Sequence, residues 1–298
     1  MASLFDYFKI HVIVFIWGFT AILGLLISIP SVEMVFYRTL IASLGTAALL
    51  LIRKQSFSIS ITDFTKLSAT GFLIAAHWIF FFLSARVSNA SVSLVGFATI
   101  AIWTALLDPI INRKKISWLE VMLGFVVIIG LYIIFQEEVE HSLGLLIGIA
   151  CGFFGAMFSV INVNFTRRIS PYQITLYEMS GATLGIMLFL PIYKIYFASN
   201  HTLMLSPLPA DWLYLLLLGL VCTVFPFSIW VDLLKRVSVF TANLSINLEP
   251  LYGIVLAVIF FPQTEVMRPG FYLGAIIILA AVFLYPLIKR WRRNLINT

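Results

Sequence analysis

Three charged side chains lie inside long apolar stretches of the sequence. They are Arg38, Glu178 and Glu249. A charge within a membrane span costs roughly 2.5–3.5 kcal/mol on insertion scales, so the charges that remain there usually face a cavity or a partner. Because an acid and a base at such depth can bind a polar ligand or carry a proton, we select these three as candidate binding residues.

Glu249 stands in the run SINLEPLYGIVLAVIFF, residues 245–261, next to Pro250. Pro250 has no N–H and its ring clashes with the carbonyl of Ile246, so the expected bend frees a polar backbone group near the membrane midplane. Asn247 adds hydrogen-bonding capacity on an adjacent face. At helical spacing, the neighbours of Glu249 form a small and polar stripe that we expect to leave room beside the carboxylate: Ala242, Ser245, Tyr252 and Gly253.

Two roles for Glu249 remain open. It is expected to bind the substrate or a coupling proton. Alternatively, Arg38 reaches it from the outer side and the two form a structural bridge.

Aromatic residues and one histidine complete the candidate substrate-binding set. An indole supplies a flat apolar wall with one donor, which suits an organic ligand, although packing between helices explains the same residues. A membrane histidine can carry a proton or be a hydrogen-bonded core residue. The residues are Trp17, His77, Trp78 and Trp103.

The amino-acid composition indicates that these residues lie within a membrane protein. With 61% hydrophobic and 11% charged residues and a mean hydropathy of +1.05, the 298-residue chain is predicted to be an all-α integral membrane protein. Its net charge of +6 comes from basic clusters between apolar runs, which excludes nucleic acid as a partner. Cys151 and Cys222 lie within apolar segments and lack the spacing of a metal site, so we expect no metal and no cofactor.

A bilayer core about 30 Å thick needs roughly 20 apolar residues of helix. Three acids near the predicted helix ends, Asp108, Glu120 and Asp232, are expected to pair with neighbouring basic residues, as with Asp232 and Arg236 four residues apart. Interruptions by charges, proline or polar clusters predict ten transmembrane helices at 8–29, 32–52, 67–85, 89–111, 117–135, 143–163, 171–193, 211–234, 239–261 and 268–288.

The basic residues predict the orientation of these segments. A cytoplasmic N-terminus puts most of the nineteen Lys and Arg residues on the cytoplasmic side, and the acidic loop 136–141 outside. Both termini are therefore expected to be cytoplasmic.

The two halves of the sequence align with one another. At an offset of 150 residues, ARVSNASVSL at 85–94 aligns with KRVSVFTANL at 235–244. At an offset of 140 residues, the segment 37–45 aligns with the segment 177–185. We therefore predict two five-helix repeats, residues 1–136 and 142–298. Because five is odd, the second repeat is inverted relative to the first, which is a recurring architecture of secondary transporters.

The chain resembles the EamA family of the drug/metabolite transporter superfamily. The resemblance rests on the order of FIWGFTAILG at 15–24, the arginine of the second span, ARVSNASVSL, and LEPLYGIVLAVIFF in the ninth. It implies a bacterial cytoplasmic (inner) membrane and often efflux of amino acids or related metabolites. One departure is Ile100, which stands where the family usually has a proline equivalent to Pro250.

The leading hypothesis is a secondary transporter, an exporter of a small organic metabolite such as an amino acid, and not an enzyme. The expected partners are the substrate, the lipid bilayer and a coupling proton, with the chain acting as a monomer or homodimer. The alternatives are a membrane-embedded enzyme for a lipid or isoprenoid substrate and a scaffold or channel-like protein. The enzyme hypothesis lacks a His/Asp cluster with metal spacing and a nucleophile motif.

Overall fold

The computed structural model describes residues 3–137, 139–246, 248–263 and 267–296, and no β-strand occurs among them. The chain begins with α1 (Leu4–Leu26), α2 (Ser31–Ile52), α3 (Ile61–Val87), α4 (Ala90–Phe97), α5 (Ile100–Asn112), α6 (Trp118–Glu137) and the 3₁₀ turn η1 (Val139–His141). It continues with α7 (Ser142–Thr166), α8 (Pro171–Tyr196), the 3₁₀ turn η2 (Ser199–His201), α9 (Pro209–Leu216), the π-helical segment η3 (Leu217–Val224), α10 (Phe225–Leu233), α11 (Val239–Ile246), α12 (Glu249–Phe260) and α13 (Pro269–Ile296).

Seven stretches of the described chain are long and apolar enough to cross a membrane. They are α1, α2, α3, α7, α8, the combined α4 and α5, and the stretch from α9 to α10. Shorter apolar stretches occupy 118–134 in α6 and 269–281 in α13. The predicted all-helical, multi-pass membrane architecture is therefore confirmed.

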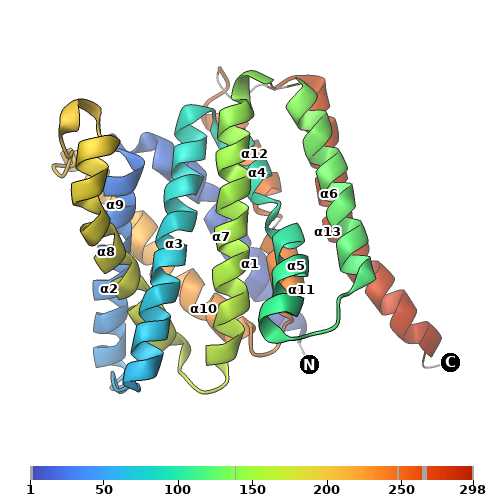
Figure 1. Ribbon diagram of the computed structural model, residues 1–298, viewed down its shortest axis with the longest axis horizontal. Coiled ribbons are helices and arrows are strands. Elements are labelled where there is room, and N and C mark those ends of the chain that lie inside the picture. Colours follow the sequence, from blue (N-terminus) through green and yellow to red (C-terminus); the bar gives the residue numbers. More distant parts are fainter. Residues whose placement is uncertain (1–2, 138, 247, 264–266, 297–298) are drawn as a thin grey trace.

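Several helices that are far apart in the sequence pack against one another (Figure 1). Helix α3 packs on both α7 and α8, α2 packs on α8, and α1 packs on α12. Helices α6 and α13 lie side by side at one edge of the molecule. The centre is consequently enclosed by helices from both ends of the sequence.

Glycines let α7 approach its neighbours closely. A Cβ at Gly148 would lie 3.0 Å from the Cα of Gly96, and one at Gly152 would lie 2.4 Å from the Thr99 hydroxyl oxygen. Small residues at such positions allow close backbone contact between membrane helices. The glycines therefore hold α7 against α4 and α5.

The predicted segment 211–234 is not a uniform α-helix. Pro226 provides no N–H for the carbonyl of Cys222, and its ring occupies the space in which that bond would form. The backbone is π-helical over η3, and the Thr223 hydroxyl donates to the carbonyl of Leu218 at 2.7 Å. A π-helical stretch of this kind often accompanies a functional site.

The acids predicted to be structural have partners near the helix ends. Asp232 pairs with Arg236 at 2.8 Å, and Asp108 pairs with Lys114 at 2.9 Å. Glu120 accepts a hydrogen bond from the Tyr285 hydroxyl at 2.8 Å. The prediction of basic partners is confirmed for Asp232 and Asp108.

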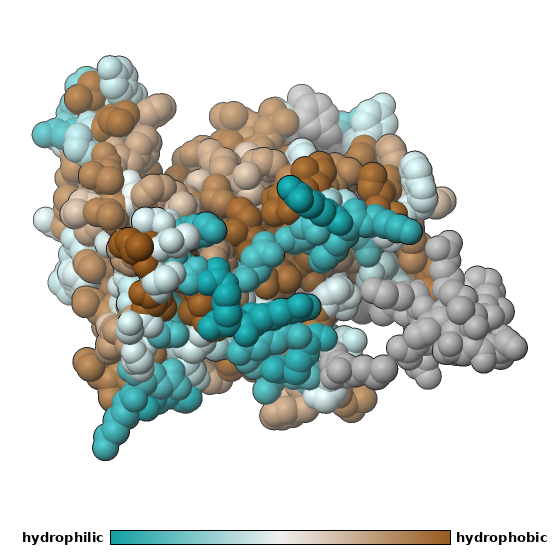
Figure 2. All heavy atoms as spheres, turned by 60° about the horizontal axis from the view of Figure 1, so that its bottom comes forward, coloured by the Kyte–Doolittle hydropathy of each residue, from teal (hydrophilic) through white to brown (hydrophobic). Residues whose placement is uncertain are grey.

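Figure 2 shows hydrophilic side chains gathered over one end of the molecule, with hydrophobic side chains along its flanks. This end lies at the bottom of Figure 1, where α2 ends and α3 begins. Arg53, Lys54, Lys114 and Lys115 are exposed. The basic clusters of the sequence thus lie in loops, outside the apolar helices.

Candidate functional site

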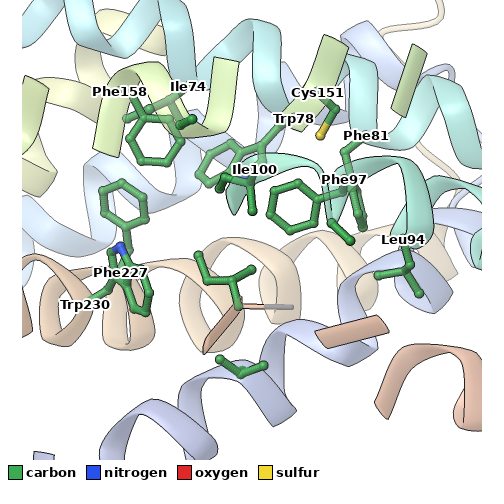
Figure 3. Close-up of a cluster of buried hydrophobic side chains, with 14 of the residues drawn as sticks. Ile74, Trp78, Phe81, Leu94, Phe97, Ile100, Cys151, Phe158, Phe227 and Trp230 are labelled. Atoms are coloured by element: carbon green, nitrogen blue, oxygen red, sulfur yellow. The ribbon is translucent and has the colours of Figure 1, made fainter. Parts of the chain in front are cut away.

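A buried cavity of about 50 Å³ lies between the helices. Five residues predicted from the sequence line it, namely Trp17, Arg38, His77, Trp78 and Glu249. The remaining lining residues are Thr20, Phe81, Phe97, Ile100, Phe158, Phe227, Trp230 and Ile246. Figure 3 shows several of these aromatic rings turned toward one another.

Arg38 is fixed in the cavity wall by one polar and one aromatic contact. Its Nε donates to the Thr223 hydroxyl at 3.0 Å, and its guanidinium carbon lies 3.8 Å from the centre of the Trp78 ring. Stacking on an indole stabilises a guanidinium when both are desolvated. No other hydrogen bond of this guanidinium occurs among the described residues.

Glu249 begins α12 and lines the same cavity. It is only 4% exposed. No hydrogen bond and no ion pair within 4.0 Å engages its carboxylate among the described residues, while Arg38 interacts with it electrostatically across a longer distance. The structural Arg38–Glu249 bridge considered from the sequence is therefore absent from this conformation.

His77 is bound on one side to the backbone of α7. Its Nδ1 lies 3.0 Å from the carbonyl oxygen of Cys151 and 3.2 Å from the sulfur of the same residue. The ring also lies 5.1 Å from Phe97 and 5.6 Å from Phe158, centre to centre. His77 is thus a hydrogen-bonded core residue that also lines the cavity.

Trp17 connects α1 to the π-helical segment. Its indole N–H donates at 3.0 Å to the carbonyl of Cys222, the group that the ring of Pro226 leaves without an α-helical partner. Its ring meets Trp230 edge-on, with centres 5.3 Å apart. The indole therefore satisfies a buried acceptor and forms part of the aromatic wall.

Two segments of the chain, residues 5–136 and 142–286, match the profile of the EamA-like transporter family. The chain belongs to this family. The resemblance predicted from the sequence is confirmed.

Two relatives of similar sequence are both described as uncharacterized transporters. A relative from Bacillus subtilis (strain 168), the uncharacterized transporter YxxF, is 24% identical over 278 residues, which are 90% of this chain and 85% of the relative. An uncharacterized transporter from Archaeoglobus fulgidus is 28% identical over 157 residues, 53% of each chain. A crystal structure with 15% identity superposes with a TM-score of 0.70 over 96% of this chain and 98% of the other, which supports the fold alone.

Three predicted residues of this EamA-like transporter lie away from the cavity. The ring of Trp103 packs on Phe153 at 5.2 Å, and Tyr252 packs on Phe15 at 5.5 Å. Glu178 is buried separately in α8. Asn247 lies outside the described residues.

The small stripe around Glu249 serves helix packing. A Cβ at Gly18 of α1 would lie 3.1 Å from the Cβ of Tyr252 and 3.3 Å from the backbone nitrogen of Gly253. Tyr252 and Gly253 therefore lie against α1, and this part of the expected stripe packs between helices. The room beside Glu249 lies on the side of Arg38 and the aromatic rings.

Sequence reasoning missed most of the aromatic wall and the partner of Arg38. Phe158, Phe227 and Trp230 are ordinary core residues by type and spacing, and only their contacts bring them to the cavity. The signal for Thr223 was Pro226, which lies inside the predicted segment 211–234 and disrupts the helix one turn earlier. Groups of three or more metal-ligating side chains are absent from the described residues.

Proposed function

We propose that this EamA-like protein is a secondary transporter that exports a small organic metabolite, such as an amino acid, by alternating access around the cavity. The observation that carries the proposal is that Arg38 and Glu249 line one buried cavity without forming an ion pair with each other. A zwitterion offers a carboxylate to Arg38 and an ammonium group to Glu249. The aromatic rings supply apolar walls for its side chain.

The small volume of the cavity implies that the surrounding helices move when a metabolite binds. Its volume of about 50 Å³ is far below the roughly 300–1,000 Å³ typical of ligand pockets. Space of this size holds water molecules, so the surrounding helices must separate to admit a metabolite. Such separation is the motion that alternating access requires.

The positions at which two helices are interrupted support an inverted repeat around the cavity. Helix α4 ends at Phe97 and α5 begins at Ile100, while α11 ends at Ile246 and α12 begins at Glu249. At the sequence offset of 150, these breaks fall within one residue of each other. Discontinuous helices at the binding site are a recurring feature of inverted-repeat transporters.

Helix pairing supports the same symmetry. Helix α3 packs on α7 and α8, and its proposed counterpart, the stretch from α9 to α10, packs on α1 and α2. Exchanging the two proposed repeats converts each of these pairs into the other. We therefore propose ten membrane crossings in two inverted units, residues 1–136 and 142–298, in a bacterial inner membrane with both termini cytoplasmic.

Metabolite profiling of cells and medium, with and without the protein, would identify the substrate. Transport would then be measured in proteoliposomes. Glu249→Gln keeps the shape and removes the charge, so a substrate ammonium loses its countercharge, and we expect at least a tenfold loss of transport. Arg38→Gln is expected to weaken transport similarly by removing the carboxylate partner.

Glu33→Gln is the matched control, because Glu33 is also a fully buried acid and shares α2 with Arg38 but does not line the cavity. This variant should transport normally. Normal transport by a well-folded Glu249→Gln protein would refute the proposed role of Glu249. An absence of transported metabolites for the wild-type protein would refute the function itself.

A further inference from the structure

Glu178 forms a second buried polar cluster that the proposed transport cavity does not use. Its side chain is 0% exposed, and neither carboxyl oxygen has a hydrogen-bond partner among the described residues. The side chains that interact with it are Thr70 of α3 and Asn162 of α7. The amide oxygen and nitrogen of Asn162 also have no partner, nor does the hydroxyl of Ser159 one turn away. We call Thr70, Ser159, Asn162 and Glu178 the Glu178 cluster.

No cation neutralises this carboxyl group within 4.0 Å among the described residues. The described residues of α7 include no charged side chain. On the other packed helices, charged and titratable groups are engaged elsewhere or exposed. Asp63 pairs with Arg168, Asp232 pairs with Lys235 and Arg236, Lys66 is exposed, Arg53 stacks on Tyr172, and Arg38 and His77 line the cavity.

An unpaired carboxylate in an apolar interior is far more costly than a neutral carboxylic acid. A neutral acid also has one O–H donor, and the cluster contains an acceptor for it in the amide oxygen of Asn162. The Thr70 hydroxyl donates to the carbonyl of Leu67 at 2.8 Å, which leaves its oxygen as an acceptor. The surroundings of Glu178 therefore suit the protonated form.

One residue of the cluster directly follows a cavity residue in the sequence. Phe158 directly precedes Ser159, and its ring lies 6.0 Å from that of Phe227, centre to centre (Figure 3). Both rings line the cavity. Along α3, Thr70 lies seven residues from the cavity residue His77, or about 10 Å at 1.5 Å per residue. The cluster is thus displaced toward the end at which α3 begins and α7 ends.

We propose that Glu178 binds the proton that couples transport to a proton gradient, and that this end of the molecule closes only when the proton is bound. The inference rests on the proposed transport function. When α7 and α8 separate, water reaches the carboxyl group and stabilises the carboxylate, and the proton passes to water. On closure, the carboxylate oxygen takes a proton from water and the neutral acid is buried again.

The protonated acid is measured directly by infrared difference spectroscopy of the purified protein after a pH change. The wild-type spectrum should contain a carboxylic acid C=O band that moves in D₂O. Glu178→Gln should remove that band, and the matched variant Glu33→Gln should keep it. If Glu178→Gln does not fold, Asn162→Leu replaces it, because loss of the acceptor must shift the frequency of the same band.

Closure is measured separately with spin labels at Lys54→Cys and Arg167→Cys, in exposed loops at this end of the protein. The distance distribution should shift toward the closed state as pH falls in the wild-type protein. Glu178→Gln is permanently neutral, so its distribution should be closed at every pH. A pH-dependent distance in Glu178→Gln, no band assigned to Glu178, or closure driven by sodium ions at constant pH would overturn the proposal.

Both measurements use the protein without substrate, so their results stand apart from the transport assay. Transport that proceeds normally with no Glu178 band refutes proton coupling at this residue and leaves the transport function intact. A Glu178 band with pH-dependent closure in a protein that transports no metabolite supports the proton site and refutes the transport function.

Discussion

Replacing Trp17 with phenylalanine tests the interaction between α1 and the π-helical segment. The indole N–H donates to the carbonyl of Cys222 at 3.0 Å. Phenylalanine keeps an aromatic ring near Trp230 but removes the donor. A buried carbonyl left without a partner costs about 1–3 kcal/mol, so we expect the free energy of unfolding to fall by that amount.

The cause can be isolated with Pro226→Ala. Alanine restores a backbone N–H at position 226, which is the α-helical donor for the carbonyl of Cys222. In that background the carbonyl has the α-helical N–H as an additional donor, so Trp17→Phe should cost less. A double-mutant cycle is therefore expected to give a coupling energy of about 1–2 kcal/mol between the two positions.

The assay is equilibrium unfolding of the detergent-solubilised protein in sodium dodecyl sulfate. Trp103→Phe is the matched control, because the Trp103 indole nitrogen is buried without a partner among the described residues and its ring also packs on an aromatic neighbour. It should change stability less than Trp17→Phe. Equal losses for the two tryptophans, or a coupling energy near zero, would contradict the argument that Pro226 creates the need for the indole.

Two other predictions concern packing and topology. Gly71→Ala should destabilise the protein by about 1–3 kcal/mol, because its Cβ would lie 2.3 Å from the carbonyl oxygen of Glu178 and force α3 from α8. Gly124→Ala, whose Cβ would meet only the side chain of Ile102 at 3.2 Å, should cost less in the same unfolding measurement, and equal costs would refute the packing argument. Reporter fusions should place residue 139 outside and residue 167 in the cytoplasm, whereas residue 139 in the cytoplasm would refute the proposed orientation.

The helical fold was predictable because the apolar environment of the bilayer is its main cause. Long apolar runs must satisfy their backbone hydrogen bonds internally in a bilayer, so the runs of the sequence correspond to helices. The details of 211–234 were not predictable from hydropathy. The π-helical conformation of η3 depends on Pro226, on the Thr223 hydroxyl and on an indole that is distant in the sequence.

The charged residues of the cavity were predictable, but most of its walls were not. Arg38 and Glu249 stand out because few charges occur within apolar spans. Phe158 and Trp230 do not stand out, since aromatic residues are common throughout this chain and packing decides which of them reach the cavity. Trp103 illustrates the converse, because its type suggested a ligand wall and its contacts place it on Phe153.

The two helix breaks differ in their local sequence. Pro250 follows the break between α11 and α12, and its fixed backbone angle suits the first turn of α12. The equivalent break between α4 and α5 has Ile100 and no proline, and there the Thr99 hydroxyl donates to the carbonyl of Gly96 at 2.8 Å. Gly152 of α7 lies directly against that hydroxyl. The break between α4 and α5 is therefore accompanied by a threonine hydrogen bond and close packing of α7, whereas a proline accompanies the break between α11 and α12.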